Sequence, residues 1–213
     1  MDNPFGDGGY RYSDAGHTEA HDYLLPAVRN ILKKLDLPSA ERQIFELGCG
    51  NGATAALLQG LGYAMVGVDP SEEGIAHARK AYPSLRLDLG SCYDDLASKY
   101  GQFPVVLSLE VVEHIFLPRL FARSVYGLLE PGGTAIISTP FHGYWKNLAL
   151  AISGKLDNHF TALWDYGHIK FWSENTLSSL LEEAGLQVLD YVRVGRIPPL
   201  AKSMIAIARK IAR

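Results

Sequence analysis

The stretch Glu46-Leu47-Gly48-Cys49-Gly50-Asn51-Gly52 decides the fold, because its three alternating glycines follow directly on a short apolar run that begins at Ile44. Glycine allows the main chain to turn tightly and to approach a ligand closely. A helix that begins after such a turn points its unpaired N–H groups at the same place. The stretch therefore predicts a ligand-binding loop between a strand and a helix.

Strands and helices alternate along the chain on both sides of this loop. Apolar runs predict strands at residues 44–47, 63–68, 85–87, 104–109, 134–138, 186–194 and 203–208. Helical spacing and end signals predict helices at 16–35, 54–61, 71–81 with Ser71 as N-cap, 118–129 and 173–184. Short apolar strands that alternate with helices indicate an α/β fold with a mostly parallel sheet and helices on both faces.

Length and composition set the class of protein. The 213 residues suit one sizeable domain, and a net charge of −3 provides no basic field for nucleic acid. Two cysteines form no disulfide framework, the start lacks a signal peptide, and no apolar run reaches the roughly 20 residues that span a bilayer. We therefore expect a soluble cytoplasmic protein, with its oligomeric state left open.

The glycine loop by itself allows two kinds of ligand. Residues 48–53 satisfy the dinucleotide pattern G-x-G-x-x-G/A, and Asp69 lies downstream at a suitable distance. That interpretation makes the protein an NAD-dependent oxidoreductase. The acid Glu46 two residues before the first glycine, and the alternating G-x-G-x-G spacing, favour another nucleoside ligand.

Three stretches in order resemble the motifs of class I S-adenosylmethionine-dependent methyltransferases. Residues 46–52 resemble their (E/D)-x-G-x-G-x-G motif, residues 66–71 (VGVDPS) their second strand ending in an acid, and residues 128–134 (LLEPGGT) their L-x-P-G-G turn. The resemblance covers about residues 44–190. It implies a Rossmann-like, doubly wound sheet of seven strands and S-adenosylmethionine as the cofactor.

The resemblance also implies which residues bind the cofactor. Asp69 would accept both ribose hydroxyls, and adenine would lie near residues 90–92, where Ser91 stands in place of the Asp of many family members. The full set of expected cofactor-binding residues is Glu46, Gly48, Cys49, Gly50, Asp69, Pro70, Ser91, Cys92 and Leu109. The alternative is that the glycines only shape a turn and Asp69 only caps a helix.

The stretch Glu110-Val111-Val112-Glu113-His114 follows the fourth predicted strand, whose carboxyl end faces the site. In a helical turn Glu110, Glu113 and His114 share one face. One interpretation makes His114 a general base for the acceptor hydroxyl, since histidine titrates near neutrality. A second makes the three residues ligands of a divalent metal with His168 as the fourth. In a third interpretation Glu113 and His114 only cap the adjoining helix and form hydrogen bonds in the core.

The E-x-x-E-H pattern resembles ubiquinone-biosynthesis O-methyltransferases and small-RNA 2′-O-methyltransferases, where these positions bind a metal. The resemblance implies a metal set of Glu110, Glu113, His114 and His168, and a catalytic set of His114, Glu110 and His168. It favours O-methylation of a small molecule. RNA 2′-O-methylation and a non-catalytic cofactor-binding module remain as alternatives, and nitrogen or carbon acceptors stay open.

Residues 140–172 are rich in aromatic side chains and predict an irregular cap over the acceptor. Interleaved aromatic residues and histidines suit an apolar or aromatic acceptor, although such residues also form satellite cores. We expect residues 1–40 to form a lid segment and helix, with Tyr10 and Tyr12 as candidates for folding over the cofactor. Residues 41–213 would then form the methyltransferase domain, with the cap at about 140–172.

Overall fold

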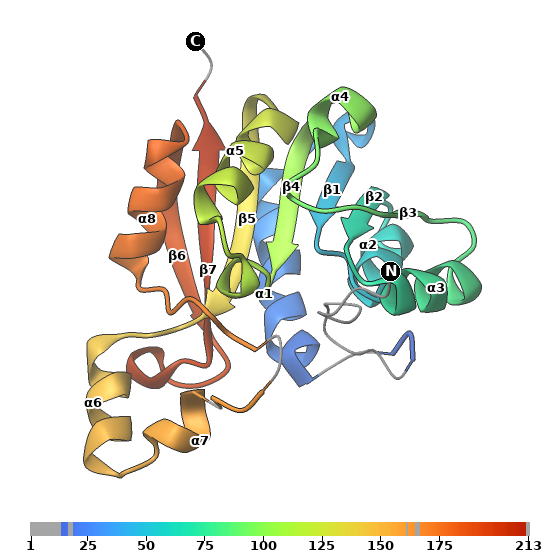
Figure 1. The fold of residues 1–213 in the computed structure, drawn as a ribbon. Coiled ribbons are helices and arrows are strands. Elements are labelled where there is room, and N and C mark those ends of the chain that lie inside the picture. The colour runs from blue at the N-terminus through green and yellow to red at the C-terminus, as the bar shows by residue number, and fades with distance from the viewer. Residues whose placement is uncertain (1–13, 17–18, 161, 165–166, 212–213) are drawn as a thin grey trace.

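A computed structural model describes residues 14–16, 19–160, 162–164 and 167–211 of the chain (Figure 1). The strands are β1 (Gln43–Leu47), β2 (Ala64–Asp69), β3 (Arg86–Leu89), β4 (Phe103–Leu109), β5 (Leu129–Pro140), β6 (Leu186–Val194) and β7 (Ser203–Lys210). The α-helices are α1 (Glu19–Leu35), α2 (Ala53–Gly60), α3 (Glu72–Ala81), α4 (Leu96–Tyr100), α5 (Pro118–Leu128), α6 (Tyr144–Ile152), α7 (Leu156–Phe160) and α8 (Glu174–Glu183). Three 3-10 turns complete the list: η1 (Ser39–Glu41), η2 (Val112–His114) and η3 (Pro198–Leu200).

The seven strands form one sheet in the order β3-β2-β1-β4-β5-β7-β6. β1 to β5 pair in parallel, and β7 runs antiparallel to both of its neighbours. The chain moves from β1 toward one edge of the sheet and then returns to place β4 on the other side of β1. A crevice at the carboxyl ends of β1 and β4 follows from this switch, and ligands bind there in sheets of this kind. The predicted fold class is confirmed.

Neighbouring residues of each central strand enter two separate cores, one on each face of the sheet. Ile44 packs with residues of α1, α2 and α3, whereas Phe45 packs with residues of α4, α5 and α8. This division follows from the alternation of side chains along a strand. Because both faces are covered, the central strands are mostly apolar, and polar residues such as Glu46 and Ser108 stand near their carboxyl ends. Within the described residues, no helix is both long enough and apolar enough to cross a bilayer.

Several local predictions hold and others are wrong. Ser71 caps α3 by accepting a hydrogen bond from the Gly74 N–H at 3.0 Å, as predicted. The prediction that residues 140–172 are irregular is wrong, because α6 and α7 lie within them. No residue of α6 is buried, although its apolar residues Tyr144, Leu148 and Ile152 recur at helical spacing. β5 starts at Leu129 rather than at residue 134, and the predicted lid residues Tyr10 and Tyr12 lie outside the described part of the chain.

Candidate active site

The glycine loop is held against β2 and needs glycine for its shape. Gly48 has φ +86°, and a Cβ atom there would lie only 2.3 Å from Cγ2 of Val111. The N–H groups of Gly48 and Cys49 both donate to the carbonyl of Val68, at 2.8 and 3.0 Å. The loop therefore combines a left-handed backbone with close packing, which a larger residue cannot adopt without strain.

Asp69 ends β2 and joins the loop to the next helix. Its Oδ2 accepts a hydrogen bond from the Gly50 N–H at 2.9 Å, and its Oδ1 accepts one from the Ser71 N–H at 2.8 Å. Burial raises the pKa of this carboxyl, although both N–H groups act in the opposite direction. Each carboxylate oxygen can accept more than one hydrogen bond, so Asp69 can fix the loop and still accept from a ligand.

One cavity of about 650 Å³ lies over the carboxyl ends of β1, β2 and β4. Its size is that of a small-molecule site. All of the residues expected to bind a cofactor line it: Glu46, Gly48, Cys49, Gly50, Asp69, Pro70, Ser91, Cys92 and Leu109. Glu110, His114 and His168 line it as well, so the glycine loop and the predicted acceptor residues share one space.

Glu46 contributes a buried carboxylate to the wall of this cavity. Its side chain is 2% exposed, and its Oε2 has no hydrogen-bond partner among the described residues. Burial raises its pKa well above the usual value, and the nearby Asp69 raises it further. A polar atom buried in this way beside a cavity fits a ligand that brings a donor or a positive charge.

The cavity also has walls that the sequence did not predict. His21 and Leu24 come from α1, and Phe116 follows η2. Asn51 lines it too, and its side-chain amide donates to the carbonyls of Asp14 and Gly16 at 2.8 and 2.9 Å. Asn51 belongs to the glycine loop, so the sequence motif could have identified it as a residue of the cavity wall. The others depend on how α1 and η2 pack on the sheet, which no local motif encodes.

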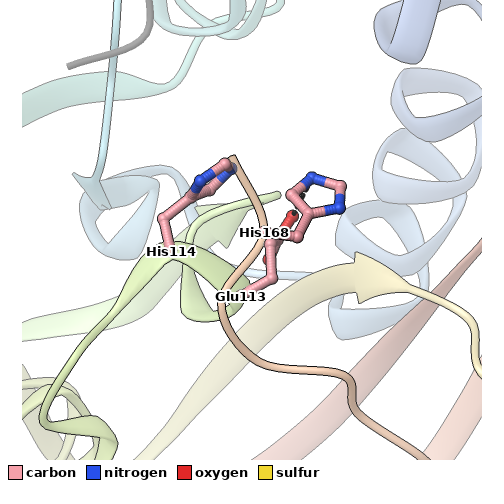
Figure 2. A group of neighbouring side chains, drawn as sticks. All are labelled: Glu113, His114 and His168. Carbon is pink, nitrogen blue, oxygen red and sulfur yellow. Dashed lines mark ion pairs between the residues drawn. The ribbon is translucent and has the colours of Figure 1, made fainter. Parts of the chain in front are cut away.

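Glu113, His114 and His168 come together beside the cavity (Figure 2), with one ligand-type atom of each within 4.8 Å of the others. Glu113 is 1% exposed, and its Oε1 lies 3.9 Å from Nε2 of His168. Its other oxygen, Oε2, accepts from the Thr139 hydroxyl at 3.0 Å, whereas Oε1 has no hydrogen-bond partner among the described residues. Burial raises the pKa of Glu113 well above its usual range, and Glu110 raises it further. Burial, and secondly His114, lowers the pKa of His168 to about 4.

This group fits a divalent cation. A carboxylate oxygen without a hydrogen-bond partner faces a neutral imidazole, and a hydroxyl fixes the second oxygen of the same carboxylate, as in the outer shell of a metal site. The backbone supports the arrangement, because the Glu113 carbonyl accepts the N–H groups of Ile169 and Lys170 at 2.9 and 3.0 Å. The loop that carries His168 is thereby docked on η2.

His114 is oriented by a backbone group. Its Nδ1 lies 3.2 Å from the carbonyl oxygen of Gly167, which accepts a hydrogen bond when Nδ1 carries the proton. That tautomer makes Nε2 the basic nitrogen of the ring. Trp164 and His168 stand edge-on to the ring, at centroid distances of 6.1 and 4.9 Å. His114 therefore has the geometry of either a general base or a metal ligand.

Glu110 does not join this group of three, contrary to the predicted set of four ligands. Its two carboxylate oxygens accept hydrogen bonds from the hydroxyls of Ser138 at 2.8 Å and Ser203 at 3.1 Å. Its backbone is left-handed, with φ 53°, and this turns it out of the helical face that the spacing predicted. Burial raises its pKa to about 7. It remains in the cavity wall as a separate carboxylate.

The aromatic residues of the cap divide between the cavity and a packed cluster. Trp164 lines the cavity. His142, His159, Phe160 and Phe171 instead pack on one another, with ring centroids 4.7 to 6.0 Å apart. Part of the aromatic content of residues 140–172 is therefore a small core of the cap.

Comparison with known proteins agrees with this architecture. The solved structure of the PH0226 protein from Pyrococcus horikoshii OT3 superposes with a TM-score of 0.68 at 18% identity, covering 95% of this chain and 100% of that one. Magnesium protoporphyrin IX methyltransferase from Synechocystis PCC 6803, solved with bound SAH, gives a TM-score of 0.64 at 18% identity over 88% of this chain and 81% of that one. At this identity the likeness shows the fold alone.

Relatives found by sequence similarity identify the family more specifically than the solved structures do. The ubiquinone biosynthesis O-methyltransferase of Ruegeria pomeroyi is 32% identical over 157 residues, which cover 72% of this chain and 63% of the relative. A probable S-adenosylmethionine-dependent methyltransferase of Mycolicibacterium smegmatis is 27% identical over 164 residues, covering 77% of this chain and 59% of the relative. The matched region thus spans less than two thirds of the length of these relatives. The model of one family, described as a methyltransferase domain, matches residues 18–191. This chain therefore belongs to the methyltransferase domain family.

Proposed function

We propose that the chain transfers a methyl group from S-adenosylmethionine to an oxygen atom of a small acceptor that is apolar or aromatic. The observation that carries the proposal is the single cavity that joins the glycine loop and Asp69 to His114 and His168. Relatives that are named as O-methyltransferases support oxygen as the acceptor atom. The exposed rings of Phe116 and Trp164 at the cavity support an acceptor with apolar surface.

The residues of the glycine loop fit the nucleoside. Close packing at Gly48 leaves no room for a side chain, so backbone groups form that wall. Asp69 would accept from the ribose hydroxyls, and the buried Glu46 suits the positively charged end of the cofactor. Ser91 and Cys92 would flank the adenine ring.

In the reaction that we propose, the acceptor oxygen attacks the methyl carbon of S-adenosylmethionine as the carbon–sulfur bond breaks, and the hydroxyl proton leaves to a base. His114 would be that base, because its Nδ1 is directed at the Gly167 carbonyl and Nε2 is then basic. The cavity wall would align the acceptor and exclude water. In the metal-assisted alternative His114 would be a ligand instead of the base, and a divalent cation held by Glu113, His114 and His168 would lower the pKa of the acceptor hydroxyl.

Calorimetric titration with S-adenosylmethionine and with NADH tests the cofactor, and we expect binding of the first only. A methyl-transfer assay over a panel of phenols and aliphatic alcohols, with and without EDTA, tests the reaction. Turnover that EDTA abolishes and Mg²⁺ or Mn²⁺ restores supports the metal-assisted form. EDTA-resistant turnover that His114 variants lose supports the metal-free base. Binding of NADH without S-adenosylmethionine would overturn the proposal.

A further inference from the structure

Helix α6 exposes large apolar side chains in its first and last turns. Tyr144, Trp145 and Ile152 are 73%, 66% and 80% exposed, and no residue of the helix is buried. Trp145 and Ile152 lie seven residues apart, two turns of the helix, and therefore on one side. Single exposed apolar residues are ordinary on a protein surface, but several large ones gathered on one helix indicate an interaction surface.

The turn η3 extends this surface. It packs beside α6, and its segment exposes Ile197 at 64% and Leu200 at 37%. Figure 1 shows α6 and η3 together, beyond the carboxyl ends of β4 and β5. We call these five residues the cap patch: Tyr144, Trp145, Ile152, Ile197 and Leu200.

The charges around the cap patch are mostly positive, although the exposed Asp157 follows directly in α7, which packs on α6. Residues 140–156 and 191–202, which carry the patch, contain no Asp or Glu, although the whole chain has a net charge of −3. They contain five basic residues: Lys146, Lys155, Arg193, Arg196 and Lys202. Arg193 is paired with Glu174 at 2.7 Å, and Lys146 donates to the Phe141 carbonyl at 2.8 Å. Lys155 and Arg196 are exposed.

We propose that the cap patch docks the protein on the surface of an anionic lipid bilayer. Trp and Tyr beside Lys and Arg, together with exposed aliphatic residues and an excess of basic over acidic residues, are typical of helices that lie in the membrane interface. Basic residues next to an anionic leaflet add to the attraction. A second copy of the chain is the poorer occupant, because two-fold pairing would set the basic residues of each copy against those of the other.

Co-sedimentation with vesicles of phosphatidylcholine alone, and of phosphatidylcholine with phosphatidylglycerol, tests the proposal independently of any methyl transfer. We expect the wild type to bind the anionic vesicles and to lose binding as salt rises. Trp145→Ser with Ile152→Ser should weaken this binding by about tenfold or more, because both side chains leave the interface. Lys155→Glu with Arg196→Glu should weaken it at least about 25-fold, since each basic residue at an anionic surface is worth about fivefold.

Two controls keep the result interpretable. Leu61→Ser removes an exposed apolar residue beside α2, away from the cap patch, and should leave vesicle binding unchanged. Titration with S-adenosylmethionine reports whether each variant is folded, and the charge-reversal variant replaces the serine variant if that one fails to fold. Absence of vesicle binding by the wild type, or equal binding by all variants, overturns the proposal. A further outcome would also overturn it: light scattering shows a dimer, only the serine variant dissociates that dimer, and no form of the protein binds vesicles.

Discussion

Oε1 of Glu113 lies 3.9 Å from Nε2 of His168, although the two residues belong to segments far apart in the sequence. The backbone of Glu113 brings them together, because its carbonyl accepts the N–H groups of the two residues after His168. The same residue therefore docks the cap loop with its main chain and faces the imidazole with its side chain. A substitution at Glu113 should therefore disturb the proposed cation site and keep the main-chain hydrogen bonds that dock the loop.

Substitution of two neighbouring hydroxyl residues on β5 tests whether the metal ligands are Glu113, His114 and His168 alone or include Glu110 as well. Thr139→Val removes the hydrogen bond to Glu113, and we expect the affinity for Mg²⁺ or Mn²⁺ to fall at least about tenfold. Ser138→Ala removes the hydrogen bond to Glu110 and should leave that affinity nearly unchanged. Calorimetric titration of the metal measures both. Equal losses in the two variants would return Glu110 to the ligand set.

His114→Ala should lower turnover by about 10²- to 10⁴-fold, the usual contribution of a positioned general base, while the Kd of S-adenosylmethionine changes little. Single-turnover methyl transfer and calorimetry measure the two quantities. His77→Ala, which removes a half-buried histidine of α3 outside the cavity wall, is the matched control. Full activity of the His114 variant on a substrate that the wild type methylates would exclude His114 as the base.

Asp69→Asn should raise the Kd of S-adenosylmethionine by about tenfold or more. The amide keeps the shape of the side chain, but its NH₂ group must face one of the two N–H donors, at Gly50 or Ser71, that the carboxylate accepts. The Asn side chain also lacks the negative charge that would attract the ribose hydroxyls. Calorimetry measures the change. Asp88→Asn, on the neighbouring strand β3 and outside the cavity wall, should bind the cofactor like the wild type.

Gly48→Ala should destabilise the fold by about 2–5 kcal/mol, combining about 1–2 kcal/mol for a left-handed residue with about 1–3 kcal/mol for the contact with Val111. Val111→Ala in the same chain removes the contact alone and should recover about half of the loss. Gly62→Ala provides the control, since Gly62 has φ +90° in open space and bears the backbone cost only. Urea unfolding measures all four proteins. No recovery in the double variant would show that backbone conformation is the whole effect.

A structural feature could be predicted from the sequence where its cause lies in neighbouring residues of the chain. Residues 46–52 and Asp69 form a strand–loop–helix unit whose shape is set by its own glycines, so the binding loop could be proposed without a structure. The left-handed turn at Glu110 could not, because it depends on Ser203 of β7, which tertiary pairing brings beside it. α6 escaped prediction for another reason: Tyr144, Leu148 and Ile152 recur at helical spacing, but the aromatic content of residues 140–172 indicated an irregular cap instead.

The position of β7 between β5 and β6 affects how the sheet can form during synthesis. β6 is made first, yet its hydrogen-bonded neighbour in the sheet is β7. Until Ser203–Lys210 has left the ribosome, the nascent chain carries β6 without that partner, and β5 has an open edge on the same side. Unpaired edges of this kind attract other chains. The docking of Ser203–Lys210 between β5 and β6 therefore closes both open edges in one step.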